Sequence, residues 1–204
     1  MKVIGITGGV GSGKSELLAY IDRHYNCKII LADEAAHRVK EPGQPCYEKL
    51  VALLSEDILN ENGTIHKERM AAKIFGDERL LAKVNAIIHP AVKELILGEI
   101  AKERIKGCIE FFFVEAALLI EDGYLDIMDE MWYIYADEKV RRSRLSLSRG
   151  YSEEKIDSIM ALQLSEEEFR KHCGVVIDNS KSLEHAYRQI DGELGSRELG
   201  AERK

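Results

Sequence analysis

The sequence predicts an α/β fold in which helices flank a parallel sheet that carries an inserted helical domain and a short helical lid. Three observations support this fold class. An apolar, β-branched segment at residues 2–7 runs directly into a glycine-rich segment and then into a helical pattern. A long helical tract without an obvious strand covers residues 46–106, and arginines crowd a short helical segment between residues 141 and 149.

The glycine-rich segment 8–15 reads GGVGSGKS, which matches the G-x-x-x-x-G-K-S pattern of a phosphate-binding P-loop. Glycines permit positive φ and a close approach of the backbone, so that successive N–H groups can point at a polyphosphate. Lys14 adds a positive charge for the β- and γ-phosphates, and the Ser15 hydroxyl is a ligand for Mg²⁺. A turn that merely joins a strand to a helix is the alternative, but the strand-loop-helix context favours a P-loop NTPase-type sheet.

Composition narrows the class of ligand and the compartment. A chain of 204 residues suits one core with an inserted or appended subdomain. Its net charge of -7 argues against nucleic-acid binding, and a small anionic ligand held by local basic clusters fits better. The 4 cysteines include no C-x-x-C pair, so we expect reduced, buried thiols rather than a zinc site or a redox motif.

The N-terminus and the distribution of apolar residues bear on localisation. The chain begins directly with the first strand pattern, which leaves no room for a signal peptide, and no apolar run is long enough to span a bilayer. We therefore expect a cytoplasmic protein with no membrane partner and no nucleic-acid partner. We expect it to be a monomer or a weak homo-oligomer.

A second short strand pattern at 28–31 is followed at once by Ala32 and Asp33. In doubly wound α/β sheets ligands bind beyond the carboxyl ends of the strands, so Asp33 is expected to project toward the crevice that holds the phosphates. The alternative is an N-cap of the following helical pattern, because Asp is a favoured capping residue. The sequence leaves both roles open.

Residues 46–106 have the pattern of a helical insertion, which turn residues interrupt at 60–64 and again at 76–77. Within it, apolar residues recur at helical spacing on both sides of His89 and Pro90. Proline at this position predicts a kink or the start of a new helix. His89 is either a structural residue or a ligand contact, and both interpretations stay open.

A strongly apolar strand pattern at 108–114 ends in Glu115. A carboxylate at such a strand end is where P-loop proteins place the acid that orients Mg²⁺ or its water. A fourth strand is predicted at 131–136. Glu121 lies between the two strands. Its interpretation as a plain exposed helix residue stays open beside any role in a site.

From residue 137 onward the pattern is typical of a mobile lid. The crowded arginines are Arg141, Arg142, Arg144 and Arg149, and Ser152 after them resembles the N-cap of a second helix. Guanidinium groups brought over a bound nucleotide stabilise the charge on a transferring phosphoryl group. For any single arginine the alternative is a solvated basic helix face.

A fifth strand at 174–179 and a closing helix at 183–190 complete the predicted core. The predicted domains are a nucleotide-binding core (1–45, 107–136 and 174–204), a helical substrate-binding domain (46–106) and a lid region (137–173).

Together these residues resemble the dephospho-CoA kinase family over nearly the whole chain and in the right order. The P-loop alone is shared by many nucleotide-binding families, whereas Asp33, the His89-Pro90 pair and the segment 177–179 make the resemblance specific. Further matching residues are Ile4, Gly5, Ile6, Thr7, Glu41, Pro42, Gly43, Asn85, Leu118, Leu119, Glu121, Gln163 and Val176.

The resemblance implies ATP-dependent phosphorylation of the ribose 3′-hydroxyl of dephospho-CoA with Mg²⁺, the last step of coenzyme A biosynthesis. It implies that Asp33 is the catalytic base, while Lys14 and the lid residue Arg144 neutralise the phosphoryl group. The implied ATP-binding residues are Gly9, Val10, Gly11, Ser12, Gly13, Lys14, Ser15 and Asn179. The implied substrate-binding residues are Thr7, Asp33, His89, Leu118 and Glu121, and the implied metal ligands are Ser15 and Glu115.

Some positions depart from the family pattern, and they concern substrate contacts rather than the reaction. They are Leu31, His37, Ala117, Ser148, Phe169 and Gly174.

Two other function classes stay open. One is a P-loop kinase acting on a nucleoside, a nucleotide or a shikimate-like hydroxyl. The other is a nonenzymatic nucleotide switch, which the lack of an N-K-x-D segment and the presence of Asp33 disfavour.

Overall fold

The computed structural model describes the backbone of residues 1–201 and the side chains of residues 1–195. Residues 202–204, at the end of the predicted core segment 174–204, lie outside the described part of the chain. The chain divides into two compact units. Unit 1 comprises Met1–Ile29 and Gly107–Lys204, and unit 2 comprises Ile30–Lys106.

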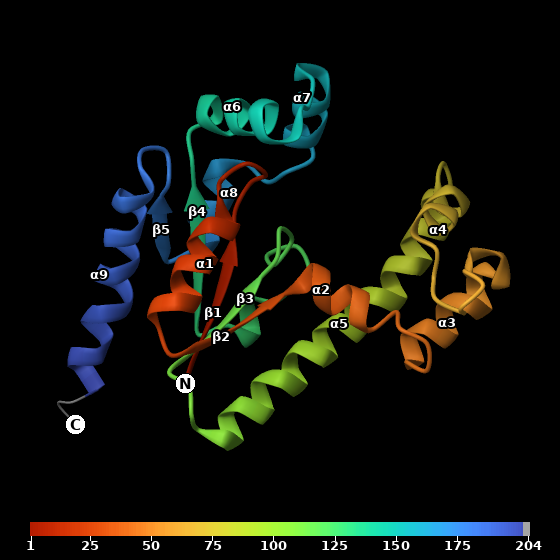
Figure 1. Cartoon of the computed structure of the whole chain (residues 1–204), viewed down its shortest axis with the longest axis horizontal. Helices are drawn as coiled ribbons and strands as arrows, with labels where there is room; N and C mark the ends of the chain where they lie inside the picture. Colours follow the sequence, from red (N-terminus) through yellow and green to blue (C-terminus); the bar gives the residue numbers. More distant parts are fainter. Residues whose placement is uncertain (202–204) are drawn as a thin grey trace. The chain divides into compact units, whose positions relative to one another are not determined.

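The sheet is parallel and has five strands in the order β2-β3-β1-β4-β5 (Figure 1). The strands are β1 (Lys2–Thr7), β2 (Cys27–Leu31), β3 (Phe111–Glu115), β4 (Glu130–Tyr135) and β5 (Val175–Asp178). β1 pairs in parallel with both β3 and β4, and β4 pairs in parallel with β5. Ile6 is in register with Glu115, so the carboxyl ends of these two strands lie at the same edge of the sheet. The predicted α/β class with a parallel sheet is confirmed.

The strands of unit 1 are mainly apolar on both faces because helices cover the sheet. Ile4, Ile6, Phe112, Phe113 and Trp132 are all essentially inaccessible to solvent. A parallel sheet that is covered on both faces requires such continuous apolar runs rather than an alternating pattern. The apolar runs that predicted the strands are therefore also the residues that form the core.

The sequence predicts the helix after the P-loop, two helices after residue 137 and the closing helix of unit 1, but not the helices at 125–127 and 166–172. The helices of unit 1 are α1 (Lys14–His24), the 3-10 helix η2 (Leu125–Ile127), α6 (Glu138–Arg149), α7 (Glu153–Ala161), α8 (Glu166–His172) and α9 (Leu183–Ala201). α9 packs on β5 and on α1, where Tyr187 stacks on Tyr20 with 3.9 Å between the ring centroids. α9 extends well beyond the predicted helix at 183–190, because the buried residues Ile190 and Leu194 continue its apolar face.

The third strand is shorter than predicted, since it begins at Phe111 rather than at Cys108. Asn26, in the loop after α1, instead forms hydrogen bonds with two of the residues that precede Phe111. Its Nδ2 donates to the carbonyl of Cys108 at 2.9 Å, and its own carbonyl accepts the N–H of Glu110 at 2.9 Å. This pairing with a distant residue makes the strand begin late, and composition gives no sign of it.

Apart from the last residues of β2 and an isolated antiparallel bridge between Leu59 and Ile65, the secondary structure of unit 2 is helical. Its helices are α2 (Ala32–Arg38), α3 (Pro45–Leu54), the 3-10 helix η1 (Glu56–Ile58), α4 (Lys67–Ile74) and α5 (Glu78–Lys106). The predicted interruptions at 60–64 and 76–77 both fall between helices. α5 continues through Pro90, so the predicted start of a new helix there is wrong. Proline removes only its own N–H from the helix, and buried residues on both sides, among them Val84 and Val92, hold α5 against its neighbours.

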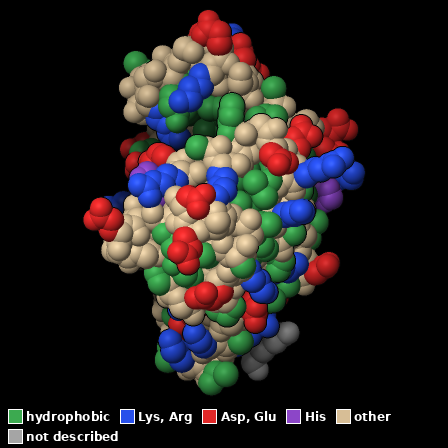
Figure 2. All heavy atoms as spheres, turned by 90° about the vertical axis from the view of Figure 1, so that its right-hand side faces the viewer, with side chains coloured by type: hydrophobic (Ala, Val, Ile, Leu, Met, Phe, Trp, Pro, Cys, Tyr) green, Lys and Arg blue, Asp and Glu red, His purple; other side chains and the backbone are tan. Residues whose placement is uncertain are grey.

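The face drawn in Figure 2 carries Lys and Arg side chains interspersed with Asp and Glu side chains, with apolar groups between them. Among residues 1–201, no helix combines the length and the apolar character needed to cross a membrane.

Candidate active site

The loop between β1 and α1 has the backbone of a phosphate-binding loop. Gly11 and Gly13 have φ values of 79° and 87°, which favour glycine strongly over any other residue. A Cβ atom at Gly13 would lie 2.4 Å from Nδ2 of Asn179, and one at Gly9 would lie 2.5 Å from Cζ of Arg141. The close packing around the loop therefore disfavours a larger residue at Gly9 and Gly13, in addition to the backbone conformation of Gly11 and Gly13.

Two arginines of α6 hold the backbone carbonyl groups of this loop. Arg141 Nε donates to the carbonyl of Val10 at 2.9 Å, and Arg144 Nη1 donates to the carbonyl of Ser12 at 3.1 Å. In a planar trans peptide group, the carbonyl of one residue and the N–H of the next point in opposite directions. The N–H groups of Gly11 and Gly13 are therefore directed away from the two arginines, where they can donate to an anionic ligand.

Asn179, directly after β5, supports the same loop. Its Nδ2 donates to the carbonyl of Ser12 at 2.8 Å. Asn179 Oδ1 and Ser12 Oγ have no hydrogen-bond partner among the described residues, although both residues are only 1% exposed. An unpaired buried polar atom costs about 1–3 kcal/mol, so the two atoms are suited to gain a partner from a bound ligand.

Lys14 and Ser15 form the start of α1 directly after the loop. Lys14 Nζ donates to the carbonyl of Gly8 at 2.7 Å and lies 3.8 Å from the carboxylate of Glu115 at the end of β3. Ser15 is exposed. A serine hydroxyl and a carboxylate are the hard oxygen donors that Mg²⁺ prefers, and substrate phosphates and water commonly complete its coordination. The residues present therefore fit a magnesium ion.

The arginines of α6 differ from one another in what they contact. Arg142 pairs with Glu138, Glu153 and Asp157, all of them exposed, which corresponds to the solvated alternative of the sequence analysis. Arg149 is exposed at the end of α6. Arg141 and Arg144 instead bind the P-loop, so α6 presents two of its arginines to the phosphate-binding loop.

Arg141 is the more deeply embedded of the two loop-binding arginines. Its Nη2 donates to Oε1 of Gln163 at 2.7 Å, in addition to its bond with Val10. Burial lowers the pKa of Arg141, but the ordinary pKa of a guanidinium is so high that the group stays charged. Arg144 completes its own contacts with a 2.9 Å bond from Nη2 to the carbonyl of Asn179.

Three of the predicted substrate-binding residues lie in unit 1. Thr7, the last residue of β1, is completely buried, and its hydroxyl donates to the carbonyl of Ala117 at 3.3 Å. Leu118 and Glu121 are exposed, and they lie in a series of turns after β3 rather than in the helix that was the alternative for Glu121. The turns are closed by backbone bonds such as that from Asp122 N–H to the carbonyl of Leu118 at 2.9 Å.

Asp33 and His89 lie in unit 2. α2 begins at Ala32 with Leu31 as its N-cap residue, so Asp33 is the second residue of the helix and the capping alternative is wrong. The position still favours a carboxylate, because the first turn of a helix is positive. Asp33 is exposed, so its carboxylate is open to a ligand.

A cavity of about 900 Å³ in unit 2 includes Asp33 in its lining. Its other charged or titratable lining residues are His37, Lys40, Glu41 and Lys67. α4 and α5 supply a wall of mostly apolar side chains, which includes Met70, Ile74, Phe75, Leu81, Val84 and Ile88. Cavities of this size hold ligands that combine polar and apolar parts. Asn85 belongs to the lining, whereas His89, one turn further along α5, does not.

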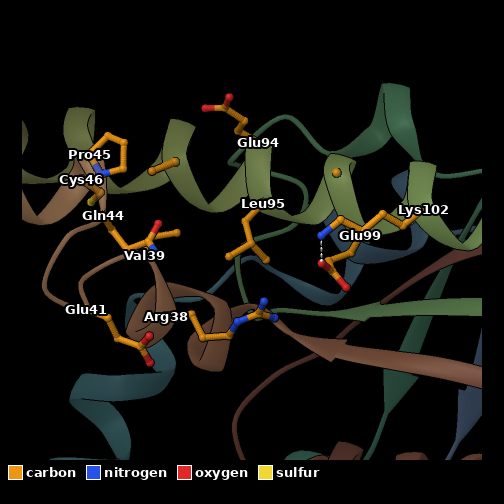
Figure 3. A pocket seen from close by; sticks show the side chains of 12 residues that line it. Arg38, Val39, Glu41, Gln44, Pro45, Cys46, Glu94, Leu95, Glu99 and Lys102 are labelled. Carbon is orange, nitrogen blue, oxygen red and sulfur yellow. Dashed lines mark hydrogen bonds and ion pairs between the residues drawn. The ribbon is translucent and has the colours of Figure 1, made fainter.

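A second cavity of unit 2, of about 480 Å³, has a different character (Figure 3). Three carboxylates line it, those of Glu41, Glu94 and Glu99, together with the cations Arg38 and Lys102. Lys102 Nζ is already paired with Glu99 Oε1 at 2.8 Å, which Figure 3 shows as a dashed line. The excess of carboxylates makes this cavity a poor site for an anionic ligand.

The way unit 1 holds the P-loop defines the class of the protein. P-loop kinases combine main-chain N–H groups for phosphate, a lysine near a strand-end acid and arginines directed at the phosphate site. In this chain Lys14 lies beside Glu115, and two arginines of α6 contact the loop. Comparison with known families narrows the class, because residues 2–185 match the family model described as dephospho-CoA kinase. The chain belongs to this family, and its reaction uses ATP.

Individual relatives agree with this assignment. A dephospho-CoA kinase of Aquifex aeolicus is 35% identical over 190 residues, which cover 93% of this chain and 94% of the relative. A dephospho-CoA kinase of Shouchella clausii is 31% identical over 187 residues, or 92% of this chain and 94% of the relative. A solved dephospho-CoA kinase from Campylobacter jejuni has a TM-score of 0.75 at 21% identity, covering 98% of this chain and 100% of that chain, and shares the fold.

The structure adds residues that the predicted site did not contain. Arg141 was one of several equivalent arginines in the sequence, and only its contacts with Val10 and Gln163 distinguish it. Lys40 and Lys67 lie 27 positions apart in the sequence, yet both line the cavity that contains Asp33. No local motif marks either lysine, so sequence spacing alone could not have found them.

Proposed function

We propose that this chain transfers the γ-phosphate of ATP to the ribose 3′-hydroxyl of dephospho-CoA and releases coenzyme A and ADP. The observation that carries the proposal is the cavity of unit 2, where an exposed carboxylate, Asp33, shares the lining with cationic and apolar side chains. An acceptor with a hydroxyl, a pyrophosphate and an apolar arm needs this combination. Membership of the dephospho-CoA kinase family supports the same substrate.

Unit 1 binds the donor in this proposal. The N–H groups of the loop and Lys14 hold the β- and γ-phosphates. The unpaired amide oxygen of Asn179 is an acceptor, so it serves a hydrogen-bond donor of ATP rather than a phosphate. Ser15 and Glu115 would hold Mg²⁺, directly or through water, and the bound ion would supply positive charge to the phosphates. Arg144 stabilises the charge that spreads over the phosphoryl oxygens as the bond to ADP breaks. The lid region 137–173 carries this arginine.

Unit 2 binds the acceptor, with the segment 46–106 as substrate-binding domain. The Asp33 carboxylate accepts the proton of the 3′-hydroxyl while the new bond between that oxygen and phosphorus forms. The bond between the γ-phosphorus and the bridging oxygen of ADP breaks in the same displacement. Thr7, His89, Leu118 and Glu121 are further proposed contacts of the acceptor, and His89 would act from a position outside the cavity lining.

The proposal is tested by measuring ADP release with a panel of acceptors at saturating ATP and Mg²⁺. We expect rapid ADP release with dephospho-CoA and far slower release with adenosine, AMP or shikimate. Mass spectrometry and phosphorus NMR of the product should show one added phosphate on the 3′-oxygen. Phosphorylation of a nucleoside or of shikimate in preference to dephospho-CoA would refute the proposal, as would ADP release that does not depend on any acceptor.

A further inference from the structure

The cavity of unit 2 changes character along the helices that form it. Lys67 is the first residue of α4, and Met70, Ala71 and Ile74 follow it in the cavity lining. The spacing i, i+3, i+4, i+7 places all four on one face of the helix. At roughly 1.5 Å per residue, the face runs about 10 Å from the backbone of the cationic residue to that of the last apolar one.

The first half of α5 presents a matching face. Leu81, Val84, Asn85 and Ile88 line the same cavity at the same i, i+3, i+4, i+7 spacing. Phe75, between the two helices, is 90% exposed, and Leu81 is 45% exposed. An apolar ligand that covers large, accessible apolar side chains in a cavity removes their surface from water, which favours binding.

Lys40 lies just after α2, and its surroundings connect it with both Asp33 and Lys67. Burial lowers the pKa of Lys40 and the positive charge of Lys67 lowers it further, while the carboxylate of Asp33 acts in the opposite direction. Both lysines line the same cavity, so their like charges act on each other there. No carboxylate among the described residues lies within ion-pair distance of either one. An anionic group bound between them would remove the repulsion.

We propose that Lys40 and Lys67 bind the pyrophosphate bridge of the acceptor and that the apolar faces of α4 and α5, with Phe75, bind its pantetheine arm. This inference rests on the proposed function, and it assigns to named residues the parts of the substrate that do not react. It also explains why the acceptor would bind in the cavity that contains Asp33 and not in the second cavity of unit 2. The second cavity has three carboxylates in its lining and its lysine is already paired, so the pyrophosphate would be repelled there.

The lysine part of the inference is tested with the full chain, by measuring kcat and KM for dephospho-CoA at saturating ATP and Mg²⁺. A hydrogen bond to a charged group is worth enough that Lys40→Ala and Lys67→Ala should each raise KM at least about tenfold. We expect kcat to change less than about threefold, because the lysines bind ground state and transition state alike. Lys40→Arg, which keeps the charge, should recover most of the affinity. Lys83→Ala removes an exposed lysine of α5 outside the cavity lining and serves as the matched control.

A KM within about twofold of the unchanged protein in both lysine variants would overturn the assignment of the pyrophosphate, since the lost charge-assisted bonds are worth more than that. An equal loss in Lys83→Ala would also overturn it, because the effect would then come from net charge. If the unchanged protein does not phosphorylate dephospho-CoA at all, the proposed function itself fails. The two failures are therefore distinguishable in one set of measurements.

The apolar part of the inference is tested with Phe75→Ser and with phosphopantetheine, the half of the acceptor that lacks adenosine. We expect phosphopantetheine to inhibit competitively against dephospho-CoA, with an inhibition constant that rises about tenfold in Phe75→Ser, since burial of a phenylalanine side chain is lost. Inhibition should also weaken in Lys67→Ala. An inhibition constant that is unchanged in Phe75→Ser, or an absence of competition with dephospho-CoA, would show that the arm binds elsewhere.

Discussion

Arg141 donates a 2.7 Å hydrogen bond from Nη2 to Oε1 of Gln163, and the same oxygen accepts the backbone N–H of Val10 at 3.2 Å. Arg141 itself returns to Val10 through a 2.9 Å bond to its carbonyl. Both polar groups of the Val10 main chain are thus held by the two side chains that are bonded to each other. The conformation of the P-loop therefore depends on Arg141 and Gln163, which are far away in the sequence.

We expect Arg141→Ala to destabilise unit 1 and to weaken ATP binding. The substitution removes two hydrogen bonds from a half-buried charged group and leaves Gln163 without one of its partners. Such a loss costs about 2 kcal/mol, which for a chain of this size lowers the thermal midpoint by about 6 °C. The KM for ATP should rise, because the loop no longer holds its N–H groups in a fixed arrangement. Thermal unfolding and steady-state kinetics measure the two effects.

Arg142→Ala is the control for this prediction. Arg142 is adjacent on α6 and makes more ion pairs, with Glu138, Glu153 and Asp157, but these are exposed to water. Exposed pairs contribute little to stability, so the midpoint and the KM for ATP should hardly change. A larger effect in Arg142→Ala than in Arg141→Ala would contradict the assignment of Arg141 to the loop.

The second prediction separates backbone strain from close packing at the P-loop. Gly13 and Gly43 have nearly equal φ values, 87° and 86°, but a Cβ atom would meet Asn179 Nδ2 at 2.4 Å at Gly13 and nothing within 4 Å at Gly43. Gly43→Ala should therefore cost about 1 kcal/mol, from the backbone alone. Gly13→Ala should cost more and should abolish measurable ATP binding, because Asn179 must leave the loop. Equal stability and ATP affinity in the two variants would show that the packing around Gly13 is unimportant.

The sequence predicts most of this fold because its strands are local and apolar. β1 was predicted to the residue, and β4 was displaced by one residue at each end, since each is a single apolar run between polar or glycine residues. The start of β3 was missed because a side chain from the loop after α1 pairs with Cys108 and so decides it. The continuation of α5 through Pro90 was missed because packing against other helices outweighs one lost backbone bond.

The same distinction applies to the candidate site. The P-loop is contiguous, so that the residue types of 8–15 indicate both its conformation and its ligand. The network of Val10, Arg141 and Gln163 is formed by side chains that only the folded chain brings together. Arg144 could be singled out by family resemblance but not by any property of its own segment. Residues whose role depends on a tertiary contact were therefore the ones that the sequence could not rank.

The third prediction concerns Arg144, which binds the carbonyls of Ser12 and Asn179. If Arg144 also stabilises the transferring phosphoryl group, Arg144→Ala should lower kcat about a hundredfold or more while KM for ATP changes much less. Arg149→Ala, on the exposed end of the same helix, should leave both constants unchanged. A rise in KM for ATP with an unchanged kcat would instead limit Arg144 to holding the loop, as Arg141 does.

The last prediction tests Asp33 as the base. Asp33 is the second residue of α2 and not its N-cap, so replacing it by asparagine removes no capping bond. Asparagine has nearly the same volume and loses only the favourable interaction of a carboxylate with the positive helix end. That interaction is worth about 0.3–1 kcal/mol at an exposed position. We therefore expect Asp33→Asn to unfold within about 3 °C of the unchanged protein and to bind ATP with the same affinity.

Turnover of dephospho-CoA by Asp33→Asn should fall at least about a hundredfold, because the amide cannot accept the proton of the 3′-hydroxyl. Glu34→Gln is the matched control, since Glu34 is the next residue of α2, is equally exposed and does not line the cavity. It makes the same change of charge in the same helical turn, so an effect of charge alone would appear in both variants. A normal rate in Asp33→Asn would remove this residue from the mechanism. An equal loss in both variants would assign the effect to the electrostatics of α2, so that only a loss confined to Asp33 identifies it as the base.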